Sequence, residues 1–238
     1  MKNTIQPFKT NIDYESYPSP VDDYIHSVTT KKNICLHATE GNNLSGAVET
    51  LAKRNHIAVH FIVDKDGKIY QFFPLRYWAF HLGIKNSGGK YDRSTIGIEI
   101  VNVGPLKLRN NRMCYWPNDF TATFCKADDT SKYATLKTPW RNYNYFANFM
   151  KAQYESVAAL CALLCKLENI NNTIISNPMD YQLSAIDDFN GIFTHATVRK
   201  DKVDVGKGWN WPYFKSMLDK YTIRIENTPK ENWSLLVL

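Results

Sequence analysis

Apolar runs alternate with polar turns along most of this chain, and the length of each run separates strands from helices. Short continuous apolar segments at 34–37 and 57–63 predict buried strands. Asp66-Gly67 lies between the second run and the apolar segment 69–73, which predicts a β-hairpin.

Longer segments with apolar residues at helical spacing follow the first strands. Leu44, Val48 and Leu51 predict one helix, and an apolar stripe from 146 to 164 predicts a longer one. Pro212 marks the start of a last helix, since the first helical turn tolerates proline. Because strands alternate with helices, the predicted fold class is α/β, a single domain with a central mixed β-sheet flanked by helices.

The ends of the chain and one internal segment lack this periodicity. Residues 1–30 are polar and predict an N-terminal arm, and 223–238 predict a C-terminal tail, which leaves 31–222 as the domain. Within it, residues 105–143 are rich in aromatic residues, Pro, Asn and Lys and predict an irregular insertion. Loops of this length are often lids or binding edges, although a surface excursion without a role is the alternative.

Composition and charge limit the expected cellular compartment and the expected binding partners. The five cysteines form no CxxC pair and are odd in number, which favours free thiols in a reducing compartment. No apolar export segment or membrane span is evident, so we expect synthesis in the cytoplasm without a signal peptide. The net charge of +6 suits an anionic polymer such as a cell wall, or a merely solvated basic surface. No dense basic run is interleaved with aromatic residues, so nucleic acid is not an expected partner.

Two histidines end predicted strands. His37 ends the run at 34–37, and His195 ends another strand at 191–195, with Asp204 nine residues later. Ligand sites in α/β sheets gather beyond strand ends. Two histidines and one carboxylate can hold Zn²⁺ and leave a fourth position open, as catalytic zinc sites require. The alternative for each histidine alone is a solvated or hydrogen-bonded side chain.

Two charged residues are candidates for proton and charge chemistry. In the predicted strand 95–102 the isoleucines share one face, and Glu99 falls on the other. A buried carboxylate needs a basic partner or a task, such as general-base catalysis. Lys202 and Asp204 project to one side of an extended segment, which would set an ammonium where it could stabilise an oxyanion. A solvated lysine is the alternative.

Five segments, in this order, resemble the zinc-dependent N-acetylmuramoyl-L-alanine amidases, the family of AmpD-like amidases, amidase-type phage lysozymes and peptidoglycan recognition proteins. The resemblance covers about 33–218. The segments are Leu36-His37-Ala-Thr39, the hairpin Val59-His60 to Gln71, Trp78-Ala-Phe-His81-Leu-Gly83, Ser94-Thr-Ile-Gly-Ile-Glu99, and Thr194-His195 through Lys202-Val-Asp204-Val-Gly206.

The resemblance implies hydrolysis of the amide between N-acetylmuramic acid and L-alanine of the peptidoglycan stem peptide. It implies Zn²⁺ on His37, His195 and Asp204, with Glu99 as acid/base and Lys202 as oxyanion partner. Substrate contacts are expected from His60, Trp78 and His81. For His60 a hydrogen-bonding role in the core is the alternative, and for His81 it is packing.

Three positions depart from the family pattern. Ala79-Phe80 places an extra residue between Trp78 and His81, and Val205 stands where proline is common. Some relatives carry tyrosine at the position of Val59, just before the hairpin histidine. Because this chain has valine there, the better comparison is with family members whose active site uses a glutamate, here Glu99.

Three functions fit this sequence. A cell-wall lytic enzyme of the phage endolysin type is favoured; it would act on the wall after release from the cytoplasm. The alternatives are a cytoplasmic amidase that recycles soluble muropeptides and a peptidoglycan-binding module without activity. The complete ligand set with Glu99 favours catalysis, and the oligomeric state is left open.

Overall fold

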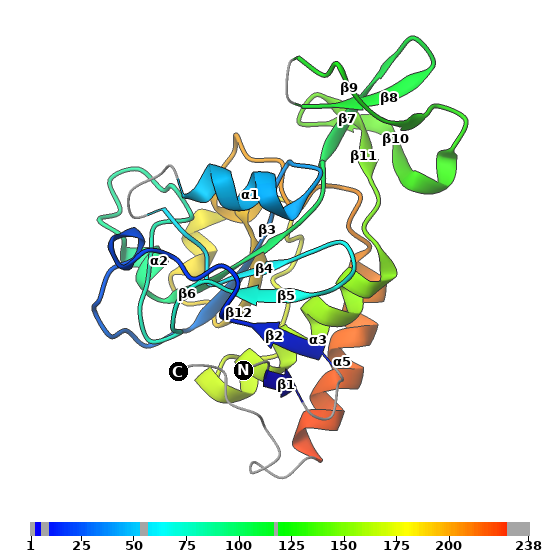
Figure 1. The fold of residues 1–238 in the computed structure, drawn as a ribbon. Coiled ribbons are helices and arrows are strands. Elements are labelled where there is room, and N and C mark those ends of the chain that lie inside the picture. Colours follow the sequence, from blue (N-terminus) through cyan, green and yellow to red (C-terminus); the bar gives the residue numbers. More distant parts are fainter. Residues whose placement is uncertain (1–2, 6–9, 53–56, 117–118, 228–238) are drawn as a thin grey trace.

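The apolar runs of the chain meet in one seven-stranded sheet (Figure 1). The computed structural model describes residues 3–5, 10–52, 57–116 and 119–227. In spatial order the strands are β1 (Asn3–Ile5), β2 (Thr10–Asp13), β5 (Ile69–Gln71), β4 (Phe61–Val63), β6 (Thr95–Ile100), β3 (Asn33–Ala38) and β12 (Gly191–Thr194).

The middle of this sheet is parallel. Strand β3 pairs in parallel with β6 on one side and with β12 on the other, and β4 also pairs in parallel with β6. The predicted hairpin is confirmed: β4 and β5 are antiparallel, and Gly67 lies in their turn with φ of 84°. A Cβ at Gly67 would lie 2.8 Å from the carbonyl oxygen of Ala152, so the turn also packs closely on a helix.

Helices and loops cover both faces of the sheet, as predicted. The helices α3 (Lys151–Glu168) and α5 (Trp211–Glu226) pack on the face that carries the isoleucines of β6. The other face is covered by α1 (Leu44–Leu51), where Asn43 Oδ1 accepts a hydrogen bond from Gly46 N, and by loops. The short helices are η1 (Val21–Asp23), α2 (Lys90–Arg93), η2 (Thr130–Lys132), η3 (Leu183–Ile186) and α4 (His195–Val198).

The predicted irregular insertion is wrong, because most of it is strand. It forms a five-stranded antiparallel sheet that projects from the main sheet (Figure 1) and packs around its own small core. Its strands are partly exposed, and paired left-handed residues at 110–111 and 141–142 form the turns of two hairpins. In spatial order the strands are β10 (Tyr133–Trp140), β11 (Tyr143–Ala147), β7 (Pro105–Arg109), β8 (Arg112–Tyr115) and β9 (Ala122–Lys126).

The ends of the chain also differ from the prediction. The N-terminal segment adds β1 and β2 to the main sheet, and Ile12 is buried in the main core. Helix α5 continues to Glu226, so the predicted tail is helical at its start, while 228–238 lie outside the described residues. Helix α3 begins at Lys151 rather than near 146, because Phe146 belongs to β11.

All five cysteines are free and buried. Among the helices of the described residues, none is both long enough and apolar enough to cross a membrane.

Candidate metal centre and active site

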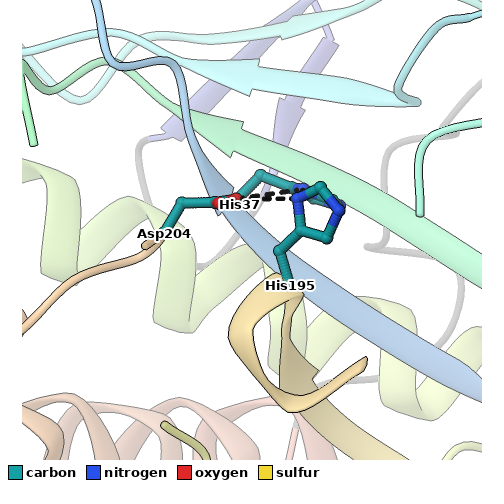
Figure 2. Close-up of side chains that lie close together, drawn as sticks. All are labelled: His37, His195 and Asp204. Atoms are coloured by element: carbon teal, nitrogen blue, oxygen red, sulfur yellow. Dashed lines mark hydrogen bonds and ion pairs between the residues drawn. The ribbon is translucent and has the colours of Figure 1, made fainter. Parts of the chain in front are cut away.

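The order of strands in the sheet brings the two predicted histidine ligands together. His37 lies near the end of β3, and His195 follows the last residue of β12 as the first residue of α4. Because β3 and β12 are parallel neighbours, their carboxyl ends lie at one edge of the sheet. The loop after α4 then returns Asp204 to the same point. Figure 2 shows the three side chains pointing toward one another.

The three side chains converge within hydrogen-bond distance. His37 Nδ1 lies 3.0 Å from His195 Nδ1 and 3.3 Å from Asp204 Oδ2, and His195 Nδ1 lies 3.1 Å from the same oxygen. All three residues are buried. Two ring nitrogens and one carboxylate oxygen therefore face one small space.

The outer ring nitrogens are held by hydrogen bonds that fix both imidazoles. His195 Nε2 lies 2.9 Å from the carbonyl oxygen of Leu82, which can only accept, so this nitrogen carries the proton. His81 Nε2 likewise faces the carbonyl oxygen of Thr95 at 3.4 Å, which leaves His81 Nδ1 to accept from His37 Nε2 at 2.9 Å. Both Nδ1 lone pairs are then directed into the cluster, as metal ligation requires.

The surroundings also set the protonation of the cluster. Burial, with the neighbouring charge of His195, lowers the pKa of His37 to about 4. Burial alone would raise the pKa of Asp204, but the two neighbouring imidazoles, first His195 and then His37, favour its ionised form and hold that pKa well below its ordinary value. At neutral pH the cluster thus offers a neutral imidazole and an ionised carboxylate, the forms that bind metals.

The donor atoms of the cluster fit a bound metal ion. Within the described part of the chain, Asp204 Oδ1 is buried and has no hydrogen-bond partner. A buried carboxylate oxygen without a donor is costly unless another group balances its charge. The nitrogen and oxygen donors of His37, His195 and Asp204, all within 4.8 Å of one another, suit a cation such as Zn²⁺.

We expect the metal-free protein to lose stability as the pH falls from about 6.5 to about 4. In this pH window His37 becomes protonated in the unfolded state but stays neutral in the folded state. The unfolded state therefore binds more protons, and the free energy of unfolding decreases as the pH falls. The full shift is equivalent to about 3 kcal/mol. Urea unfolding of chelator-treated protein at neutral pH and at about pH 4.5 measures it. The His37→Gln variant should show a smaller change; an equal change in both proteins would contradict this assignment.

Glu99 lies beside the cluster on the neighbouring strand. It is paired in register with His37 across β3 and β6, so the two side chains leave the same face of the sheet, roughly 4.8 Å apart at the backbone. Two residues earlier, a Cβ at Gly97 would lie 3.0 Å from His81 Nδ1, so the absence of a side chain there leaves room for the His81 ring. The strand that carries Glu99 thus also makes room for the histidine that orients His37.

A family model described as N-acetylmuramoyl-L-alanine amidase matches residues 28–207, which include the complete cluster and Glu99. The chain belongs to this amidase family. Membership makes the protein an enzyme that hydrolyses the amide between N-acetylmuramic acid and L-alanine. A comparison with curated proteins gives no significant match.

One solved amidase structure shares the fold, and two further solved structures show a weaker similarity. The amidase AmiD from E. coli, in complex with anhydro-N-acetylmuramic acid-L-Ala-D-gamma-Glu-L-Lys, is 17% identical, with a TM-score of 0.50 over 81% of this chain and 59% of AmiD. The Staphylococcus aureus hydrolase AmiA is 17% identical, with a TM-score of 0.49 over 90% of this chain and 84% of AmiA. A mutant endolysin from Bacillus subtilis is 19% identical, with a TM-score of 0.46 over 88% of this chain and 99% of the endolysin chain.

Two of the three substrate contacts predicted for this amidase do not fit the structure. His60 is fully buried, and its ring nitrogens face the backbone N–H of Gly97 and the carbonyl oxygen of Tyr77. Trp78 is buried, with the Arg93 guanidinium 4.9 Å from its ring centroid. His60 therefore has the core hydrogen-bonding role, and Trp78 packs in the interior.

The third residue, His81, is buried against the cluster of His37, His195 and Asp204 instead of lying on an exposed surface. It is 8% exposed, and Nδ1 bonds His37. Its backbone N–H and that of Leu82 both donate to Asp92 Oδ1, at 2.8 and 2.9 Å. Buried Asp92 therefore fixes the segment that supports both histidines of the cluster, a role that the sequence did not reveal.

Lys202 and two residues that the sequence analysis missed line a pocket of this amidase. The pocket includes Glu40, Lys202 and Arg141. Glu40 follows the ligand strand by two residues, a position that could have been noticed. Burial, with the charge of Asp204, raises its pKa. No sequence pattern indicated a role for Arg141, because its position depends on the fold of the insertion.

Proposed function

We propose that this amidase is zinc-dependent and that His37, His195 and Asp204 hold the ion. The observation that carries the proposal is the convergence of these three buried side chains at one sheet edge, with both imidazoles oriented by their outer nitrogens. Three protein ligands leave one position of a tetrahedral site for water or substrate, which is the arrangement of catalytic zinc. A bound Zn²⁺ would polarise the scissile carbonyl and lower the pKa of water.

The remaining chemistry is assigned to Glu99 and Lys202. The Glu99 carboxylate takes a proton from the attacking water and returns it to the departing amine of L-alanine. Its place beside His37 in the sheet supports this role. The Lys202 ammonium, two residues before Asp204, donates to the carbonyl oxygen as negative charge develops there. Its presence in the pocket lining supports this second role.

In the cell we propose a lytic role on peptidoglycan, of the endolysin type. The net charge of +6 favours approach to an anionic cell wall. A recycling amidase would instead act on small soluble muropeptides after they reach the cytoplasm. The two roles share the bond that is cut and differ in the size of the substrate.

Purified protein should therefore release stem peptides from intact sacculi, with one zinc ion per chain. The measurement compares the rate of new amine formation on sacculi with the rate on soluble anhydromuropeptides, and metal content is determined by elemental analysis. Fast cleavage of soluble muropeptides with no release from sacculi would assign the recycling role. Binding to sacculi without cleavage of either substrate would leave a non-catalytic module.

A further inference from the structure

A pocket of about 510 Å³ lies beside the metal centre. Two of its walls come from segments adjacent to the ligands: Glu40 follows His37, and Lys200 and Lys202 lie between His195 and Asp204. The third wall comes from the projecting sheet, through the β10–β11 turn and the start of β11. The insertion therefore closes a pocket that the main sheet leaves incomplete.

The β10–β11 turn is fixed to the ligand segment by a guanidinium. The two terminal nitrogens of Arg141 donate to the carbonyl oxygens of Arg199 and Ala196, at 2.9 and 3.0 Å. These carbonyls belong to the short helix that His195 begins and to the residue after it. Two hydrogen bonds from one planar group define the position of the turn relative to His195.

A second contact ties the same hairpin to the other side of the ligand loop. A Cβ at Gly208 would lie 2.1 Å from the carbonyl oxygen of Ala147, and a Cβ at Gly206 would lie 2.9 Å from the Phe146 ring. Both partners are the last residues of β11. Strand β11 therefore packs against the backbone just after Asp204, and the hairpin contacts the loop at both ends.

The pocket favours an anion. Four of its nine lining residues are basic and two are acidic. One acidic residue, Asp201, is paired with Arg199 through two hydrogen bonds. The other acidic residue, Glu40, interacts electrostatically with Lys202, and Lys200 Nζ lies 4.9 Å from the centroid of the Tyr181 ring.

We propose that the β10–β11 turn is part of the substrate site of this amidase, and that the pocket it closes binds a carboxylate of the stem peptide. Lys200 and the N–H groups of Arg141 that are not bonded to the two carbonyls would contact this carboxylate. Arginine suits the role because its planar fork matches a carboxylate. The inference rests on the proposed function, since it places the peptide side of the scissile amide toward this pocket.

Two soluble muropeptides that differ only in a carboxylate or carboxamide on the residue after L-alanine test the proposal. Wild type should show a KM about tenfold or more lower for the carboxylate form, the effect of one charged hydrogen bond. Lys200→Gln and Arg141→Ala should remove most of this preference through KM rather than kcat. Arg141→Lys should keep part of it. Arg112→Ala, at the exposed far end of the insertion, is the matched control and should change neither KM.

Binding separates failure of the pocket from failure of the proposed reaction. Calorimetry of both muropeptides with the Glu99→Gln protein measures the preference without turnover, and zinc content and thermal unfolding of each variant exclude misfolding. Equal binding of the two peptides, or an unchanged preference in both Lys200→Gln and Arg141→Ala, would overturn the pocket proposal. A carboxylate preference in binding without hydrolysis by wild type would support the pocket and contradict the proposed reaction.

Discussion

Replacing Asp204 by alanine is expected to abolish zinc binding and amidase activity together. The substitution removes one of three ligands and leaves His37 and His195 with their Nδ1 atoms 3.0 Å apart and no carboxylate between them. Two neutral imidazoles hold Zn²⁺ much more weakly than a site that includes an anionic oxygen. Elemental analysis after dialysis, with peptide release from sacculi, measures both losses, and activity should fall to the uncatalysed background.

Asp219→Ala provides the matched control for this experiment. Asp219 lies on α5, is half exposed, and pairs with Lys215 one turn away, so its removal changes only a surface ion pair. The control should keep zinc and full activity. An Asp204→Ala protein that keeps both would contradict the ligand assignment, whatever the control does.

Glu99→Gln is expected to lower kcat by about 10²–10⁴-fold while zinc remains bound, because general acid–base catalysis contributes on this scale. The amide preserves the size of the side chain on β6 and its place beside His37, but it cannot accept and return the proton. Initial rates on soluble muropeptides and elemental analysis separate the two properties. A normal kcat would contradict the role of Glu99, and loss of zinc would show that its effect is on the metal centre instead.

A glutamate far from the cluster provides the control for the loss of one negative charge in Glu99→Gln. Glu155 lies on α3, with its side chain 44% exposed and 3.8 Å from the Lys151 ammonium. Glu155→Gln removes the same charge from the opposite side of the sheet and should leave kcat unchanged. The comparison distinguishes a local proton transfer from a general effect of net charge.

The convergence of His37 and His195 could be predicted from the sequence because it depends on the period of strands and their ends. His37 and His195 each end an apolar run, and parallel strands present such ends at one edge of the sheet. Glu99 followed from alternation, since the isoleucines of its strand occupy the opposite face. These properties are local, so tertiary contacts were not needed to find them.

The parts that could not be predicted depend on contacts between distant segments. The strands of the insertion, such as β10 and β8, alternate buried with exposed positions and contain few buried residues, so their pattern resembled a loop. Trp78 was expected on a surface, yet a Cβ at Gly89 would lie 2.8 Å from its ring, so a distant glycine makes room for its burial. Arg141 acquires a role only when the β10–β11 turn reaches the backbone of α4.

The pairing of β3 with β12 also has a consequence for the order of events in folding. His37 and His195 are 158 residues apart in the chain, and they meet only when these two strands are adjacent. Pairings between such distant segments are generally slow to form, since closing a long loop costs conformational entropy before the new contacts offset it. We therefore expect partly folded chains to lack the metal centre, so that the appearance of high-affinity zinc binding during refolding marks the completion of the main sheet.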